Sequence, residues 1–330
     1  MFMLRKIFYL LFFLHTFSLF ANADEPPVPR LYVSPNWRHG EIGTIMIYPT
    51  NSLPKVKAKL IDPNGKVRAT VQMFPYRFNK REGGEVAAVA MFGLSPELPS
   101  GLYSILVTTE KSNDFRSWET STFVIGKKYP HKTIHFGTRG SRIQSTRPSK
   151  ERIRQAKRFY QALETYSPGS IFSTGPMQWP IRARWRSSSG FGERRTFVYT
   201  NGVRGGDFHD AQDMAGLPIG TPIYAAAQGR VVLAEYRVVT GYTIIIEHLP
   251  GTFTLYYHMN GITTYKGKQV KPGELIGYLG TTGFSTGPHL HFSLRVNGWP
   301  VDPNIYVKKP ILDKHWMLRT IRKAQASRHR

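Results

Sequence analysis

The sequence contains no cysteine among its 330 residues. Disulfides, thiolate metal sites, cysteine nucleophiles and a lipid-modified cysteine near the N-terminus are therefore all excluded. Any metal that the chain binds must be held by histidine and carboxylate side chains. Acidic residues are also scarce, because 21 Asp and Glu stand against 45 Lys and Arg and leave a formal net charge of +24. A surface with this charge attracts polyanions.

Residues 1–23 have the pattern of a secretory signal peptide. The basic pair Arg5-Lys6 precedes an apolar run from Ile7 to Phe20, and Ala21-Asn22-Ala23 fits a signal peptidase site. We expect an exported chain that begins at Asp24 and has no transmembrane segment after cleavage. The alternative is an uncleaved membrane anchor, which the short apolar run disfavours.

Residues 24–128 are expected to form an antiparallel β-sandwich of the immunoglobulin-like type. Apolar residues alternate with lysines from Lys55 to Leu60, a turn follows at Asp62–Gly65, and the alternation resumes from Val67 to Met73. Further strand-like runs, separated by turn residues, lie at 42–48, 86–92, 102–108 and 120–125.

Residues 129–187 are expected to be a basic connector with one helix. From 127 to 158 there are eleven Lys or Arg and a single acid, Glu151. Ser149 is the predicted N-cap, and the predicted apolar stripe consists of Ile153, Ala156, Tyr160 and Leu163. A solvated charged face is a better interpretation than a nucleic-acid patch, because no nucleic-acid module is recognisable, and no nucleic-acid partner is expected.

Residues 188–310 are again β-rich, with strand-like runs separated by glycine-containing turns, and 311–330 are expected to be a basic, partly helical tail. The chain is thus predicted to be mainly β, with a sandwich, a helical connector and a C-terminal antiparallel sheet.

Five of the eleven histidines lie between His209 and His291. His209-Asp210-Ala211-Gln212-Asp213 offers an imidazole and a carboxylate, and either could bind zinc. In His289-Leu290-His291 both imidazoles lie on one face of a strand. The same alternation predicts that His258 shares a face with Tyr256, opposite Leu255 and Tyr257. His248 is assigned to structure.

Each of these patterns alone is weak, since isolated histidines are usually surface or core residues. Together they supply three candidate metal ligands and two further imidazoles. A catalytic zinc site with an open position for water requires such a set.

The segment from Gly280 to Phe292, Gly-Thr-Thr-Gly-Phe-Ser-Thr-Gly-Pro-His-Leu-His-Phe, resembles the signature of the lysostaphin/LytM-type peptidases. The resemblance extends to Gly190–Arg195, Gly220–Ala225 and Val270–Gly277, and it covers the chain from Ser188 to Pro303.

This resemblance implies one Zn²⁺ per chain with His209, Asp213 and His291 as ligands. It implies that His258 and His289 are catalytic, and it leaves open which of them is the general base. The implied activity is hydrolysis of peptide cross-links or cross-bridges of bacterial peptidoglycan, in the periplasm or cell envelope or after secretion. Anionic envelope polymers are further expected partners of the basic chain.

Two positions depart from the family pattern. Ala211 stands where the family usually has glycine, and Ser293 where it often has glutamate. If Ala211 needs a positive φ angle, the loop between the ligands must adjust.

Three other hypotheses stay open. Some family members lack the zinc site and act as scaffolds that activate other wall hydrolases, and the sandwich could serve as a polymer-binding or adhesive module. Alternatively, the sandwich positions or covers the catalytic cleft. Tyr256 or Tyr199 could line that cleft, although packing roles are equally expected for both.

Overall fold

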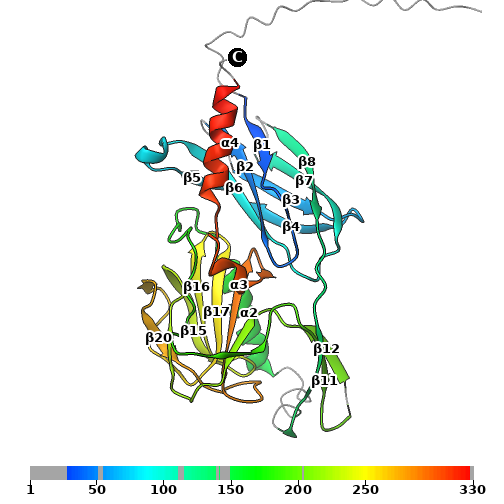
Figure 1. The fold of residues 1–330 in the computed structure, drawn as a ribbon, viewed down its shortest axis with the longest axis vertical. Coiled ribbons are helices and arrows are strands. Elements are labelled where there is room, and N and C mark those ends of the chain that lie inside the picture. The colour runs from blue at the N-terminus through cyan, green and yellow to red at the C-terminus, as the bar shows by residue number, and fades with distance from the viewer. Residues whose placement is uncertain are drawn as a thin grey trace, which may run out of the picture.

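The computed structural model describes residues 28–50, 55–110, 115–138, 141, 149–202 and 204–327. The expected signal peptide at 1–23 lies outside these residues. Within them the protein is mainly β and consists of two parts stacked along its long axis, an upper sandwich and a lower, larger sheet (Figure 1). No helix in the described part of the chain is long and apolar enough to cross a membrane.

The upper part is a sandwich of two four-stranded antiparallel sheets. One sheet has the order β1 (Arg30–Val33), β2 (Ile42–Tyr48), β6 (Val86–Gly93), β5 (Phe74–Arg77), and a 3₁₀ turn at Lys80–Glu82 joins β5 to β6. The other has the order β4 (Val67–Gln72), β3 (Val56–Ile61), β7 (Gly101–Thr109), β8 (Ser117–Val124). Immunoglobulin folds arrange strands A-B-E-D and C-F-G in a comparable way.

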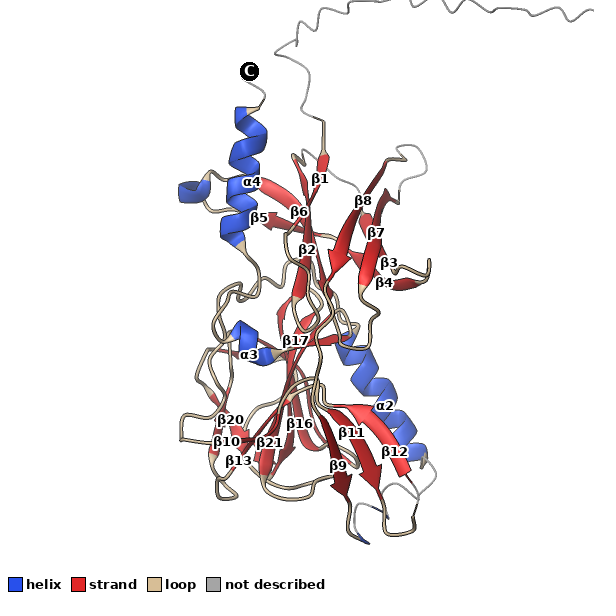
Figure 2. Cartoon of the chain, turned by 45° about the vertical axis from the view of Figure 1, so that its right-hand side comes forward, coloured by secondary structure: helices blue, strands red, loops and turns tan. Residues whose placement is uncertain are grey.

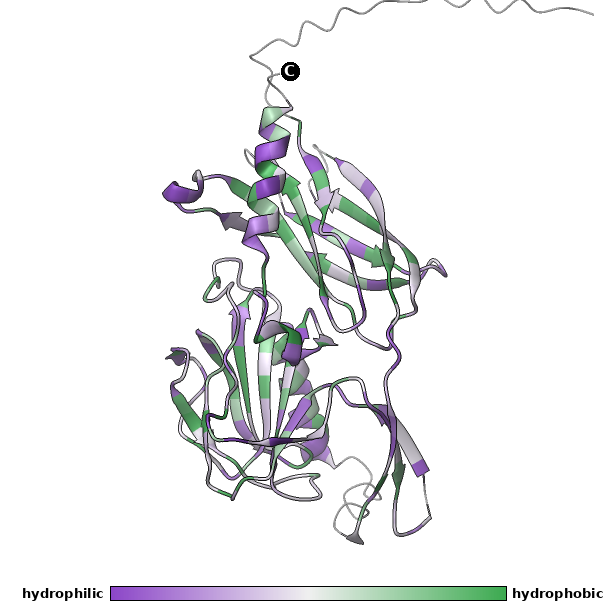
Figure 3. Cartoon of the chain, in the orientation of Figure 1, coloured by the Kyte–Doolittle hydropathy of each residue, from purple (hydrophilic) through white to green (hydrophobic). Residues whose placement is uncertain are grey.

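Hydrophilic and hydrophobic residues are mixed along the strands of the sandwich (Figure 3). In β3 the residues Val56, Ala58 and Leu60 are buried, while the two intervening lysines are exposed. The buried residues meet those of the opposite sheet in one apolar core that includes Trp37 and Phe92. The predicted sandwich is therefore present and is closed by its own core.

The lower part is built on a large antiparallel sheet. Its order is β10 (Arg186–Ser189), β13 (Gln212–Ala215), β21 (His289–Val296), β17 (Thr252–Met259), β16 (Gly241–Leu249), β15 (Gly229–Arg237), β19 (Gln269–Val270), with β22 (Trp299–Val301) also paired to β21. A small sheet of β14 (Pro222–Tyr224), β20 (Leu275–Tyr278) and β18 (Gly261–Ile262) lies beside it, and the short helix α3 (Pro303–Tyr306) follows β22.

The segment 129–187 contains more than the expected helix. Strand β9 (His131–His135) pairs in parallel with β11 (Arg194–Val198), which in turn pairs with β12 (Arg204–Phe208). Figure 2 shows these three strands beside helix α2 (Lys150–Leu163). The segment thus builds part of the lower region and is not only a linker.

Helix α2 begins as predicted but buries a different face. The Ser149 hydroxyl accepts a hydrogen bond from the Arg152 amide, as an N-cap should. The buried residues are Gln155, Phe159, Ala162 and Leu163. The predicted stripe is therefore wrong in part: Leu163 is buried as expected, but Ile153 and Tyr160 are 59% and 60% exposed. Phe159 decides the orientation, because its ring packs against Tyr257 of the large sheet and under the Arg237 guanidinium.

The segment 311–330, expected to be a tail, contains helix α4 (Lys314–Ala326), which returns to the sandwich. Met317 and Ile321 of α4 are buried in a core that also contains Met46 of β2 and Phe74 of β5, two strands of the first sandwich sheet. The Gln325 amide donates hydrogen bonds to the Tyr48 hydroxyl at 3.0 Å and to Glu85 Oε1 at 2.8 Å. This core continues into the lower region, so the two parts share one apolar interior.

The sandwich meets the lower region at the turn between β21 and β22. Asn297 Nδ2 donates a hydrogen bond to the Met91 carbonyl at 2.7 Å, and Trp299 Nε1 donates one to the Arg68 carbonyl at 3.3 Å. A β-carbon at Gly93 would lie 2.7 Å from the Trp299 carbonyl oxygen, so only glycine permits this approach. The sandwich also contacts the segment before His209, where the Arg194 guanidinium donates to the Pro96 carbonyl at 3.2 Å. That the sandwich positions or covers the cleft stays a prediction.

Candidate metal centre and catalytic cleft

The sheet brings three of the candidate residues into direct contact. Asp213 of β13 lies opposite His291 of β21, and His209 directly follows β12, in the short connection to β13. His209 Nε2 is 3.0 Å from Asp213 Oδ1 and 3.2 Å from His291 Nδ1, and His291 Nδ1 is 3.1 Å from Asp213 Oδ1. All three side chains are buried. Three metal-binding atoms therefore face a common point.

The spacing of these atoms fits a small tetrahedral cation. Zinc bonds of about 2.0–2.1 Å to nitrogen and oxygen in tetrahedral geometry place neighbouring ligand atoms roughly 3.3–3.4 Å apart. The separations here are 3.0–3.2 Å. Two histidines and one aspartate also leave a fourth position, as in catalytic zinc sites.

Each of the three side chains also contacts a further group that fixes its orientation. His209 Nδ1 donates a hydrogen bond to the Gly190 carbonyl at 3.0 Å, which leaves Nε2 for the common point. The second oxygen of Asp213, Oδ2, accepts from the Arg195 guanidinium at 3.1 Å. His291 Nε2 lies 3.3 Å from Asp210 Oδ1. The ring of Tyr257 stacks on His291 with centroids 4.9 Å apart and planes at 4°.

Charges in the cluster shift its pKa values in opposite directions. Burial opposes ionisation of Asp213, but the imidazoles of His209 and His291 outweigh burial and hold its pKa well below the usual range. Burial also opposes a charge on His291, yet Asp210 and Asp213 outweigh it and raise the pKa of His291 to about 9. The pocket thus favours positive charge at its centre, as a cation site requires.

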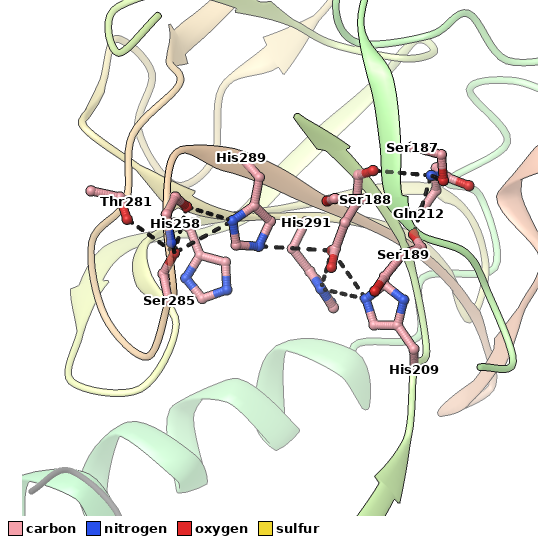
Figure 4. Close-up of polar contacts among 12 residues, drawn as sticks. Ser187, Ser188, Ser189, His209, Gln212, His258, Thr281, Ser285, His289 and His291 are labelled. Atoms are coloured by element: carbon pink, nitrogen blue, oxygen red, sulfur yellow. Dashed lines mark hydrogen bonds and ion pairs between the residues drawn. The ribbon is translucent and has the colours of Figure 1, made fainter. Parts of the chain in front are cut away.

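His258 and His289 lie beside this cluster, with ring centroids 4.8 Å apart (Figure 4). His258 Nδ1 donates to the Thr282 carbonyl at 2.8 Å, and His289 Nδ1 donates to the Gly287 carbonyl at 2.8 Å. Both Nε2 atoms are left as acceptors, and His289 Nε2 lies 3.8 Å from Asp213 Oδ1. Burial, assisted by the neighbouring imidazoles, lowers the pKa of His258 to about 3.

His258 reaches the cleft through a β-bulge, which the sequence did not reveal. Thr243 of β16 faces two residues of β17, Tyr257 and His258, and His258 has a φ angle of +62°. The alternation therefore breaks, and Tyr257 and His258 both line the cleft. The prediction that His258 shares a face with Tyr256 is wrong, because Tyr256 points into the apolar core on the other side of the sheet.

The loop before β21 fixes His258 by its backbone. Gly283 has a φ angle of +76°, and a β-carbon there would lie 2.4 Å from the Gly241 amide nitrogen. Only glycine allows the loop to lie this close to the β15–β16 turn. The carbonyl of the preceding residue, Thr282, is the one that His258 Nδ1 contacts.

The cleft around these residues has a volume of about 680 Å³. An aromatic group closes one side, since Phe136 stacks on Phe284 at 4.1 Å and on Tyr199 at 5.5 Å. Lys132 of β9 and Arg152 of α2 also line the cleft. Among the described residues, those that line it begin at Lys132, so the sandwich strands take no part. Of the two tyrosines considered from the sequence, Tyr199 lines the cleft and Tyr256 does not.

The two departures from the family pattern have structural explanations. Ala211 is fully buried and is not among the described residues with positive φ, so its methyl group requires no adjustment of the loop. Ser293 follows His291 on the same face of β21, and its hydroxyl donates a hydrogen bond to the Asp210 carbonyl at 2.7 Å.

His248 is separate from the cluster. Its Nδ1 donates to the Gln228 carbonyl at 2.7 Å, and its Nε2 accepts from the Thr254 hydroxyl at 2.7 Å. Burial lowers the pKa of His248 to about 4, so it is a neutral core residue, in agreement with the structural assignment.

Sequence reasoning missed four residues of the site: Asp210, Arg195, Tyr257 and Arg295. Asp210 lies inside the first motif and could have been noticed there as a second carboxylate. Arg295 follows His291 at the i+4 position of a strand, so strict alternation would have placed it on the same face. Arg195 ends the segment Gly190–Arg195 that carries part of the family resemblance, but nothing in the sequence assigned it a role, and no signal identified Tyr257.

Comparison with known proteins agrees with this geometry. Residues 207–303 match the sequence model of peptidase family M23. Peptidoglycan DD-endopeptidase ShyA of Vibrio cholerae serotype O1 is 39% identical over 125 residues, which are 38% of this chain and 28% of that protein. DD-carboxypeptidase/endopeptidase Mpg of Neisseria meningitidis serogroup B is 43% identical over 86 residues, which are 26% of this chain and 20% of that protein. The chain thus matches less than a third of the length of these curated relatives.

A crystal structure described as an M23 peptidase from Pseudomonas aeruginosa has a similar fold. The TM-score is 0.55 at 24% sequence identity, and the likeness covers 81% of this chain and 93% of the other. At this identity the likeness concerns the fold alone.

Proposed function

We propose that this chain, whose residues 207–303 form a domain of peptidase family M23, is an exported zinc metalloendopeptidase that hydrolyses peptide cross-links or cross-bridges of bacterial peptidoglycan. The observation that carries the proposal is the convergence of two histidines and an aspartate on one point, with two more imidazoles beside it. The relatives described as a DD-endopeptidase and a DD-carboxypeptidase/endopeptidase support the choice of substrate.

His209 Nε2, Asp213 Oδ1 and His291 Nδ1 would hold the zinc ion, because these are the atoms that face one another. When bound there, zinc supplies Lewis acidity that activates water and a peptide carbonyl near neutral pH. The protein contributes ligands whose orientation is fixed in advance by Gly190, Arg195 and Tyr257.

His258 and His289 would move the protons. Each has Nδ1–H committed to a backbone carbonyl and Nε2 free to accept. A neutral imidazole in this tautomer can take a proton from the attacking water at Nε2 and, as the imidazolium, return it to the leaving amine; an imidazole that is protonated at Nε2 can donate a hydrogen bond to the developing oxyanion. The ring centroids of His258 and His289 are 4.8 Å apart on one side of the ligand cluster, so the two imidazoles could act on the same substrate group in these different roles.

The substrate would lie in the cleft between the β9–β11–β12 sheet and the glycine-rich loop. Phe136, Tyr199 and Phe284 offer apolar surface in this cleft, and Lys132 offers positive charge. The excess of basic residues over the whole chain would favour adsorption to anionic envelope polymers. Export is inferred from residues 1–23.

The test uses purified protein that begins at Asp24, isolated peptidoglycan, and mass spectrometry of the soluble products. We expect release of peptide fragments that requires zinc and is lost in His291→Ala. Equal release by wild type and His291→Ala would overturn the proposal. Binding of both proteins to peptidoglycan without any release would instead favour the non-catalytic scaffold.

A further inference from the structure

Asp210 is a half-buried carboxylate beside the proposed metal site that the proposed chemistry does not use. It directly follows the ligand His209, yet its side chain turns away from the common point and towards His291. The contact joins Asp210 Oδ1 to His291 Nε2 at 3.3 Å, on the side of the imidazole opposite to Nδ1. Asp210 therefore contacts His291 at Nε2, the ring nitrogen that does not face the proposed metal position.

Asp210 is itself held by side chains of β21. The Arg295 guanidinium forms an ion pair with Asp210 Oδ2, and Arg295 also donates to the Gly298 carbonyl at 3.1 Å. The Ser293 hydroxyl holds the Asp210 backbone at 2.7 Å. His291, Ser293 and Arg295 alternate along β21, so one face of one strand supplies a ligand and both groups that fix Asp210.

The arrangement matches a general requirement of metal-binding histidines. A ligating imidazole usually donates its second N–H to a carboxylate or carbonyl, which fixes the tautomer and the ring and strengthens the ligand. His209 meets this requirement through the Gly190 carbonyl, whereas His291 has Asp210 within reach of Nε2. His291 Nε2 is buried, and its contact with Asp210 is an ion pair at 3.3 Å and not an aligned hydrogen bond.

We propose that Asp210 and Arg295 are positioning residues for the metal: Asp210 holds the His291 ring with Nδ1 towards the ion, and Arg295 holds Asp210. This inference rests on the proposed zinc site. Arg295 lies near the turn that contacts the sandwich, so the same pair joins the metal centre to the interface between the two parts.

The test measures zinc affinity, by competition with a chromophoric chelator, on metal-free protein. Asp210→Asn keeps the shape but removes the charge, and it should weaken zinc binding by about 10- to 100-fold. Arg295→Met should give a smaller loss in the same direction. The double variant should bind zinc no more weakly than Asp210→Asn alone, because both changes act through one contact.

The matched control is Asp62→Asn, because Asp62 also forms an ion pair with an arginine, Arg68, but lies in the sandwich and is not among the residues that line the cleft. It should leave zinc affinity unchanged. Absorption of the cobalt-substituted proteins gives a second readout, since a displaced His291 ring alters the d–d bands, whereas a purely structural ion pair would affect only thermal stability.

Zinc affinity of Asp210→Asn within twofold of wild type, in a protein with a wild-type circular dichroism spectrum, would overturn the positioning role and leave the peptidase proposal intact. If Asp210→Asn does not fold, Arg295→Met with unchanged affinity and cobalt spectrum overturns it equally. Failure of the wild type to bind zinc would overturn both proposals.

Discussion

Two neighbouring strands bring histidines to the same cleft in different ways. In β21 a regular alternation places His289 and His291 on one face and Leu290 in the core. In β17 a bulge and a φ angle of +62° turn His258 to the cleft beside Tyr257. The regular strand could be predicted from spacing, whereas the bulged strand could not. The difference also separates the proposed roles, because β21 would provide a metal ligand, His291, whereas β17 would provide a proton-transfer group, His258.

The largest expected effect is that of His291→Ala in β21. It removes one of three ligands, so both zinc binding and peptidoglycan cleavage should fall to background. Zinc content after gel filtration and release of peptide fragments measure the two losses. Retained zinc with full cleavage would mean that β21 does not hold the metal.

His258→Ala in β17 tests the other half of the comparison. Loss of a general acid or base should lower kcat by about 10²- to 10⁴-fold, while zinc affinity stays close to wild type. Steady-state kinetics on a soluble peptide substrate and chelator competition measure both quantities. A parallel collapse of zinc binding would remove the proposed division between the two strands.

A third histidine is His248 on the neighbouring strand β16. Its protonation should change only the stability of the fold. Its pKa is lowered to about 4 in the folded protein, so the unfolded state binds a proton first as pH falls below about 6.5. Stability is therefore present above pH 6.5 and is lost towards pH 4, by about 3 kcal/mol for the full shift.

The measurement compares urea unfolding of metal-free wild type and His248→Gln between pH 7 and pH 4. The variant should lose less stability over this interval because it lacks the titrating group. Identical pH dependence in the two proteins would refute the assignment of His248 as a neutral core residue.

The smallest expected effect is the difference in stability between glycine and alanine variants at one position in each of the two strands. At His258 the backbone is left-handed, so His258→Gly should be more stable than His258→Ala by about 1 kcal/mol. At His289 the backbone is regular, so His289→Gly should be less stable than His289→Ala by roughly 0.5–1 kcal/mol. Chemical denaturation of the metal-free variants measures both differences, and the same sign at both positions would argue against the bulge.

Sequence predicted those features that depend on local repetition. The alternation in β3 and β21, the cap at Ser149 and the positions of His209, Asp213 and His291 all follow from spacing or from a motif. The helix stripe of α2 was wrong because two apolar faces were available and Phe159 found its partner, Tyr257, only in the folded sheet. Asp210 also needed the fold, since Arg295 lies 85 positions further along the chain.

The segment 311–330 shows the same limit. Its charges suggested a tail, but Met317 and Ile321 lie four positions apart and are buried against residues near the start of the chain. Spacing revealed a helix there, and only tertiary structure revealed that this helix has a partner.

The position of α4 has a consequence for synthesis on the ribosome. The outer face of the first sheet, with Met46, Tyr48 and Phe74, is made early, but α4, which covers it, is translated only after the whole of the large sheet. N-terminal regions generally begin to fold as they emerge, and exposed apolar surface at that stage favours aggregation. Helix α4 cannot cover this face until more than 200 further residues, from Phe78 to Lys314, have been made, so the chain depends on its last described helix to finish its first layer.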